Sequence, residues 1–150
     1  MTTRLSSPKD LLALAGKQLG TSGWHDITQE QVNLFADATG DHQWIHVDPD
    51  RAKAGPFGGT IAHGYLTVSL ALVLLADVLH IDDVKEVLNY GINKVRFPAP
   101  VPVGAKVRAG VTLALAGERA GGIEAIFELR YELEGTDRPP CVAELVYLYR

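Results

Sequence analysis

The chain has 150 residues, of which 47% are hydrophobic and 21% are charged, and its net charge is −4. This length suits one ordinary globular domain, so we expect residues 1–150 to form a single domain. The 14 Lys and Arg side chains are outnumbered by 18 Asp and Glu side chains. Since the phosphates of a nucleic acid require a broad positive surface, the composition argues against a nucleic-acid partner.

The cysteine content and the apolar segments predict the cellular compartment of the protein. Cys141 is the only cysteine, so neither an intrachain disulfide nor a multi-cysteine metal site can form, as is usual in a reducing compartment. The N-terminus shows no secretory pattern. The apolar stretch 61–79 contains polar residues such as Asp77, whereas a membrane span needs about 20 predominantly apolar residues. We therefore expect a cytoplasmic protein with no membrane segment.

The first 27 residues predict a short helix and a short strand. Residues 7–15 have an amphipathic pattern, with Ser7 in a capping position and Pro8 in the first turn. We expect this helix to be an accessory lid. Residues 23–27 have the pattern of the end of a strand.

A second helix is predicted to end just before the part of the chain that carries the chemistry. Thr28 and Gln31 have the spacing of a capping box, which marks a helix start. The helix should run through Ala38, with Gly40 as its left-handed C-terminal cap. Asp41 then falls on a loop.

The segment 41–59 is predicted to be a functional loop, because it is long and rich in His, Asp, Pro and Gly. The following residues, 60–79, are apolar nearly all round, which is typical of a helix surrounded by other structure. We expect one long buried helix at the centre of the protein.

The C-terminal half has the pattern of antiparallel strands. Four runs with many Val, Leu and Tyr residues partly alternate in polarity, and they comprise residues 87–97, 105–115, 122–134 and 141–149. Gly and Pro clusters between these runs predict three hairpin-like connections, at 98–104, 120–122 and 135–140. A buried helix followed by such strands indicates an α+β fold in which the sheet curls around the helix.

Asp41 and His46 are the candidate catalytic pair. A carboxylate accepts hydrogen bonds, and an imidazole accepts or donates them near neutral pH, so together they could hold and activate a water molecule. The Gly-rich run 58–64 leads into the buried helix. Amides in the first turn of a helix lack helical partners and could stabilise an oxygen that gains negative charge. Gly64, without a Cβ, would let that oxygen approach the backbone.

These residues resemble the hydratase motif of a known family. The stretches FADATGDHQWIH at 35–46 and GGTIAHGYL at 58–66 are similar to the motif of the MaoC-like dehydratases, or R-specific enoyl-CoA hydratases, including a nodulation-protein-N-like branch. The stretch VRFPAPVPVG at 95–104 also matches, so the resemblance spans most of the chain. The common pattern has Asn-Pro where this chain has Gln43 and Trp44, so the spacing is kept and the turn changes.

The resemblance implies a hot-dog fold, in which a curled antiparallel sheet wraps around a long central helix, and a homodimer. It implies reversible addition of water across the trans-2 double bond of an acyl-CoA or acyl-carrier thioester, giving an (R)-3-hydroxyacyl thioester. No metal or redox cofactor is expected, and coenzyme A enters only as part of the substrate. Carried over by position, Asp41 and His46 are the acid/base pair and the Gly64 amide binds the oxyanion. The edge strands of a small curled sheet also favour pairing with a second copy.

Further residues are candidates for binding the substrate. Trp44 could form part of the wall of the acyl tunnel. His63, beside the oxyanion glycine, could be a second base, or it could orient the backbone or pack. Basic side chains could bind coenzyme A phosphates through charge-assisted hydrogen bonds. They form two groups, Lys94 and Arg96 on a predicted strand and Arg51 and Lys53 on the loop.

Three other interpretations stay open. A protein of this fold could be a noncatalytic subunit that binds acyl thioesters, or a thioesterase that directs water at the carbonyl carbon. A zinc site is chemically conceivable, because three imidazoles and a carboxylate could serve as ligands; the set would be His42, His46, Asp48 and His63. These residues lack the helical spacing of metal ligands, so we expect no metal.

Overall fold

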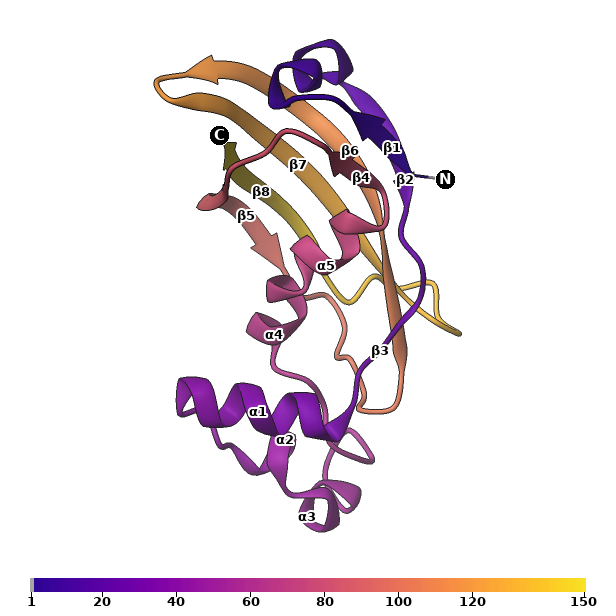
Figure 1. Cartoon of the computed structure of the whole chain (residues 1–150). Helices are drawn as coiled ribbons and strands as arrows, with labels where there is room; N and C mark the ends of the chain where they lie inside the picture. The colour runs from indigo at the N-terminus through magenta and orange to yellow at the C-terminus, as the bar shows by residue number, and fades with distance from the viewer. Residues whose placement is uncertain (1) are drawn as a thin grey trace.

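A computed structural model describes residues 2–150, and its main element is a curled antiparallel sheet (Figure 1). The strand order is β2-β6-β7-β8-β5, and the two-residue β3 also pairs with β6. The bounds are β2 Lys17–Thr21, β3 His25–Asp26, β5 Val87–Arg96, β6 Lys106–Arg119, β7 Gly122–Leu133 and β8 Val142–Tyr149. The four predicted C-terminal strands are therefore confirmed.

The sheet buries one face because its long strands alternate in polarity. In β6, for example, Val107, Ala109, Val111 and Leu113 are fully buried, while the residues between them are partly exposed. Successive side chains of a strand point to opposite faces, so this pattern directs one apolar face into the core. That face packs against the helices held in the curve of the sheet (Figure 1).

One predicted hairpin is wrong. The strands β6, β7 and β8 form consecutive antiparallel neighbours, but β5 pairs with β8 at the far edge of the sheet. The segment 98–104 therefore crosses from one edge of the sheet to another strand and makes no hairpin. Clusters of Gly and Pro indicate where a chain turns, whereas the choice of strand partner depends on contacts remote in sequence.

The predicted long central helix is also shorter and interrupted. Two short helices, α4 (Gly64–Ser69) and α5 (Ala71–Ala76), are separated at Leu70. The residues that follow form β4 (Leu79–Ile81), which pairs in parallel with β1 (Thr3–Leu5). Continuous apolarity indicated burial correctly, but it does not distinguish a buried helix from a buried strand. Among residues 2–150, no helix is long and apolar enough to cross a membrane.

The N-terminal helix belongs to the core and is not an accessory lid. It is a 3-10 helix, η1 (Pro8–Leu14), and its Leu11 is 0% exposed within the main hydrophobic cluster. The short strands β1 and β2 on either side of it lack a strong alternating pattern, and sequence reasoning missed them.

Three helices form a layer beyond one end of the sheet (Figure 1). They are α1 (Gln29–Thr39), α2 (Trp44–Val47) and α3 (Pro49–Lys53). Helix α1 begins as predicted, with the Thr28 side chain accepting from the Gln31 amide, and it ends at Gly40 with φ 82°. The predicted loop 41–59 instead contains α2 and α3. Asp48 followed by Pro49, a cap and a first-turn proline, was the signal for α3.

A second hydrophobic cluster attaches this helical layer to the sheet. It joins Ile27 and Val32 at the start of α1 to Leu66 of α4 and to Val107 and Leu133 of the sheet. Because these side chains are nearly all fully buried, the loop between α1 and α2 is held at a defined distance from the start of α4.

The buried position of η1 generates a stability prediction. Replacing Leu11→Ala leaves a cavity in the main core, so the free energy of unfolding should fall by about 2–5 kcal/mol. Leu12→Ala is the matched control, because Leu12 is 37% exposed, and it should cost about 1 kcal/mol or less. Urea unfolding followed by circular dichroism measures both changes. Equal, small losses would mean that η1 is a peripheral lid after all.

Candidate active site

The end of α1 places Asp41 beside the start of α4. The left-handed Gly40 ends the helix and turns the chain, as predicted. The backbone carbonyl of Asp41 then accepts a hydrogen bond of 2.9 Å from Nε2 of His63. Its carboxylate accepts hydrogen bonds from the side chain of Gln43 at 3.2 Å and from the Gln43 amide at 3.4 Å.

His46 lies in α2, and hydrogen bonds fix both its ring and its backbone carbonyl. Its ring is 5% exposed, and Nδ1 lies 2.7 Å from the backbone carbonyl of Ile61. Its own backbone carbonyl accepts from the side chain of Gln29 at 2.7 Å. The same Gln29 side chain accepts from the Thr60 hydroxyl at 2.6 Å. One partly buried amide therefore joins α1, α2 and the segment before α4.

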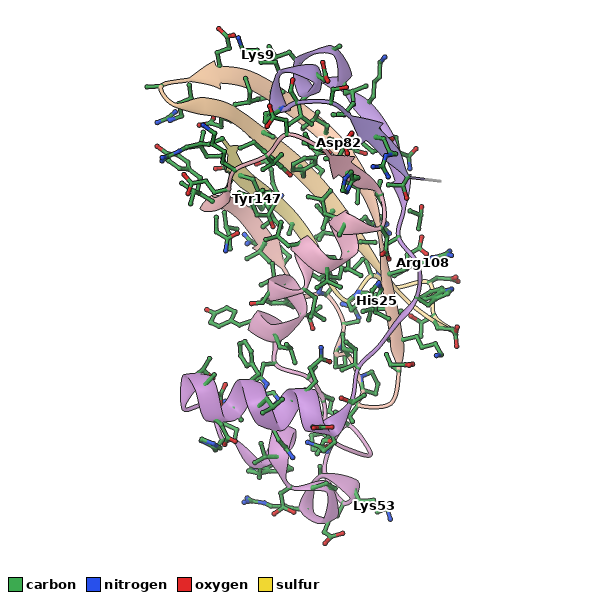
Figure 2. The ribbon with its side chains drawn as sticks, in the orientation of Figure 1. Lys9, His25, Lys53, Asp82, Arg108 and Tyr147 are labelled. Atoms are coloured by element: carbon green, nitrogen blue, oxygen red, sulfur yellow. The ribbon has the colours of Figure 1, made fainter. Side chains whose placement is uncertain are left out.

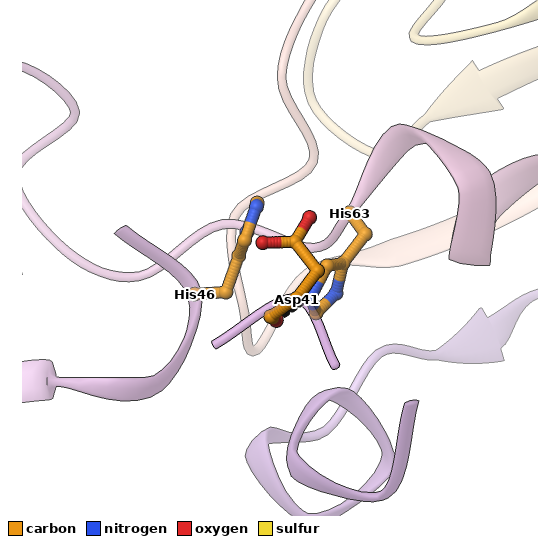
Figure 3. Close-up of side chains that lie close together, drawn as sticks. All are labelled: Asp41, His46 and His63. Carbon is orange, nitrogen blue, oxygen red and sulfur yellow. Dashed lines mark hydrogen bonds between the residues drawn. The ribbon is translucent and has the colours of Figure 1, made fainter. Parts of the chain in front are cut away.

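His63 completes a cluster that the sequence pattern had not assembled. It stands at the N-cap of α4, is 3% exposed and stacks on His46, with ring centroids 3.8 Å apart and planes 24° from parallel. Phe35 of α1 packs on it from another side at 4.9 Å. One side-chain nitrogen or oxygen from each of Asp41, His46 and His63 lies within 4.8 Å of the others. Figure 3 shows the three side chains gathered at this point.

The surroundings of Asp41 favour its ionised form. Partial burial alone would raise the pKa of this carboxyl group. The hydrogen bonds from Gln43 and the attraction of the imidazoles of His46 and His63 outweigh that effect and lower the pKa below the ordinary value for aspartate. Asp41 is therefore a carboxylate at neutral pH, able to accept a hydrogen bond or a proton.

A cavity of about 470 Å³ opens onto this cluster. It is lined by Phe35, Thr39, Asp41, His46, His63, Gly64, Tyr65 and Phe97. A second cavity of about 330 Å³, mostly apolar, shares His46, Gly64 and Phe97 with the first. The two hollows therefore meet at His46, Gly64 and Phe97, beside the cluster of Asp41, His46 and His63.

Gly64 is needed for close packing at this point. A Cβ at Gly64 would lie 3.0 Å from two ring carbons of Phe97, which is tighter than ordinary contact. Gly64 is the first residue of α4, so its amide has no partner within the helix, and the residue lines the cavity. With only six residues in α4, the local amide rather than a long helix dipole would act on a ligand oxygen.

The other predicted binding residues lie outside the cavity around Asp41. Trp44 packs against Gly55 and under the guanidinium of Arg51, 4.4 Å from its ring centroid, so it stabilises the α2–α3 turn. Lys94 lines a separate hollow on the sheet, and the exposed Arg96 bonds to the carbonyl of its neighbour Val95.

Neither Arg51 nor Lys53 lines the cavity, and the four candidate zinc ligands do not come together. Lys53 extends outward from α3 (Figure 2). His42 bonds to Asp37 at 2.9 Å, and Asp48 caps α3 by accepting from an amide of that helix. Asp41, instead of His42 and Asp48, lies close to the two buried imidazoles of His46 and His63.

Sequence reasoning missed the aromatic walls of the cavity. Phe35 and Phe97 stand within two of the three quoted stretches, but a motif does not reveal that a helix residue and a residue after β5 will line one cavity. Tyr65 is 72% exposed, and its ring centroid is 6.4 Å from that of Phe97. An aromatic residue directly after Gly64 was the signal available.

Comparison with known proteins places the chain in a family. Residues 10–126 match the family described as "MaoC like domain". The chain is 54% identical over 144 residues to "3-hydroxyacyl-thioester dehydratase Z" of Mycobacterium tuberculosis strain H37Rv, covering 95% of each chain. It is 41% identical over 143 residues to "Nodulation protein N" of Rhizobium meliloti strain 1021, covering 93% of this chain and 89% of the relative. The chain belongs to the MaoC-like dehydratase family.

Solved structures show the same fold. The (R)-hydratase from A. caviae involved in PHA biosynthesis superimposes with a TM-score of 0.70 at 25% identity, covering 89% of this chain and 97% of that one. A monoamine oxidase regulatory protein from Archaeoglobus superimposes with a TM-score of 0.75 at 20% identity, covering 100% and 98%. The curled sheet around a central helical segment is therefore the hot-dog fold, as predicted.

The low pKa of Asp41 generates a titration prediction. Gln43→Leu removes the side-chain donor, so the pKa of Asp41 should rise towards the ordinary value. Carbon NMR of the Asp41 carboxyl group during an acid titration measures this, with Gln18→Leu on β2 as the control. Because the native pKa is lowered, ionised Asp41 contributes stability above the ordinary aspartate range and loses it as pH falls through the native pKa. An unshifted titration in Gln43→Leu would contradict the assigned cause.

Proposed function

We propose that the protein is an R-specific enoyl-CoA hydratase, a hydro-lyase that adds water reversibly across the trans-2 double bond of an enoyl thioester to give the (R)-3-hydroxyacyl thioester. The observation that carries this proposal is the placement of an ionised Asp41 and a buried His46 on one cavity with the Gly64 amide. The relatives named as a thioester dehydratase and as an (R)-hydratase support it. The proposal includes the carrier of the acyl group, which we take to be coenzyme A.

The hydrogen bonds of His46 define what its ring can do. A backbone carbonyl only accepts, so Nδ1 of His46 carries the proton that bonds to Ile61, and Nε2 of the neutral ring has a lone pair. Asp41 is ionised, so both members of the pair can accept a hydrogen bond from one water. Either can then take a proton from that water as it attacks C3, and the two act as a coupled pair.

The electron flow requires a site for negative charge. As the water oxygen bonds to C3, the electrons of the double bond move towards the thioester oxygen, which becomes enolate-like. The Gly64 amide is the proposed donor to that oxygen, because it lines the cavity and lacks a helical partner. A proton delivered to C2 completes the addition, so the site ends with the protons it began with. No redox cofactor or metal is needed for this balance.

Hydration is tested with purified protein and crotonyl-CoA by following the enoyl absorbance. The assay contains EDTA, which should leave the rate unchanged, and the product is examined for the R configuration. Asp41→Asn and His46→Gln should each lower kcat by roughly 10² to 10⁴-fold, the usual scale for acid/base groups. Asp37→Asn and His42→Gln are matched controls, because this exposed pair bonds outside the cavity, and they should retain activity.

The alternative functions give different outcomes in the same assay. Release of free thiol would identify a thioesterase. Binding of enoyl thioesters with no turnover for any chain length would identify a noncatalytic binding subunit. Full activity in Asp41→Asn would refute the assigned pair.

We further propose that the protein is a cytoplasmic homodimer in which each chain forms a single domain. Two apolar side chains of edge strand β5, Tyr90 and Ile92, are 49% and 54% exposed, and only β8 pairs with this strand among the described strands. The exposed Tyr65 of α4 meets Phe97 just after β5, so the apolar surface continues onto the helices. A second copy covering this surface would remove both an open edge and an apolar patch.

Sedimentation measures this directly, and the expected mass is twice 16.2 kDa. Ile92→Asp should shift the protein to the monomer, because it places a charge in the proposed interface. Leu115→Asp is the matched control, since Leu115 is 61% exposed but lies on β6, and it should stay dimeric. A wild-type protein that sediments as a monomer at micromolar concentration would refute the homodimer.

A further inference from the structure

His63 contacts both members of the proposed catalytic pair. Its Nε2 bonds to the backbone carbonyl of Asp41 at 2.9 Å, and its ring lies on that of His46 at a centroid distance of 3.8 Å. The ring comes from the segment that leads into α4, whereas Asp41 and His46 come from the loop after α1 and from α2. A residue that only packed in the core would not need both contacts.

The remaining nitrogen of His63 is an acceptor without a partner among residues 2–150. Because the Asp41 carbonyl can only accept, Nε2 of His63 carries the proton, and the neutral ring has a lone pair on Nδ1. This atom is buried and makes no hydrogen bond to the described part of the chain. Buried polar atoms in native proteins almost always bond to protein or water, so this position calls for a donor.

We propose, on the basis of the hydratase function above, that His63 is a third catalytic residue whose Nδ1 accepts a hydrogen bond from the reacting water. The spacing of the cluster fits one water. Two acceptors that each lie about 2.8 Å from a water, at the tetrahedral angle, are about 4.6 Å apart. One side-chain nitrogen or oxygen of each of Asp41, His46 and His63 lies within 4.8 Å of the others, a separation that suits one shared water.

The other groups that face His63 are compatible with this role. Asp41 is anionic, Phe35 of α1 packs against the ring as an uncharged wall, and Tyr65 lines the same cavity.

The cluster has a role in the reaction. When the water oxygen forms its bond to C3, the broken O–H bond delivers its proton to an acceptor of the cluster. A proton from the cluster is delivered to C2, and the carbon–carbon π electrons end in the new C2–H bond. The cluster therefore holds as many protons after the addition as before it.

Two isosteric substitutions separate this role from a structural one. In His63→Gln, the amide reaches the position of Nε2 and can keep the bond to Asp41, but the Nδ1 acceptor is lost. In His63→Asn, the amide reaches the position of Nδ1 and can keep the acceptor, but the bond to Asp41 is lost. A catalytic His63 predicts the larger loss in His63→Gln, whereas a purely structural His63 predicts the larger loss in His63→Asn.

The kinetics of crotonyl-CoA hydration provide the measurement. We expect His63→Gln to lower kcat by roughly 10²-fold or more with little change in KM. Unfolding by urea should match the wild type, which shows that the fold is intact.

The outcomes distinguish this inference from the proposed function. If the wild type hydrates enoyl thioesters and His63→Gln retains its kcat, or is faster than His63→Asn, the role of His63 is refuted and the hydratase stands. If the wild type hydrates no enoyl thioester of any chain length, the proposed function itself fails. Nitrogen NMR of the wild-type ring should show Nε2 protonated in the neutral form, and a proton on Nδ1 alone would also overturn the inference.

Discussion

The hydrogen bond between Nδ1 of His46 and the carbonyl of Ile61 is the contact on which the site depends. It fixes the ring orientation, and it leaves the Nε2 lone pair of the neutral ring for chemistry. Ile61 is held in turn, because its amide bonds to the carbonyl of Ile45 at 2.9 Å. The helix that carries His46 and the segment that leads to Gly64 are thus joined by two hydrogen bonds, which fix the position of His46 relative to Gly64.

The partly buried side chain of Gln29 extends this constraint to α1. It donates to the His46 carbonyl and accepts from Thr60, so the three segments that border the cavity share one amide. The hydrophobic cluster around Ile27, Val32 and Leu66 supplies the packing behind them. The end of the sheet therefore positions a site that is built from short helices and loops. Because packing holds these short elements in place, they do not need to be stable in isolation.

The predictions that succeeded rested on local rules. Thr28 and Gly40 define the ends of α1 through capping, and capping involves only neighbouring residues. The four C-terminal strands were readable from alternation, which burial on one face imposes. The long central helix and the 98–104 hairpin failed because both depended on partners elsewhere. The residues after α5 form a strand only because β1 lies beside them, and β5 pairs with β8 across the sheet.

The sequence by itself determined the family and the curled antiparallel sheet, and it marked Asp41 and His46 as candidates, because motif spacing and polarity patterns are properties of the chain. Only the tertiary structure decided that His63 stacks on His46, that Phe97 closes against Gly64, and that Trp44 and Lys94 lie away from the cavity. Each of these contacts joins segments remote in sequence or depends on the direction of a side chain. Such relations arise from packing, and no local pattern encodes them.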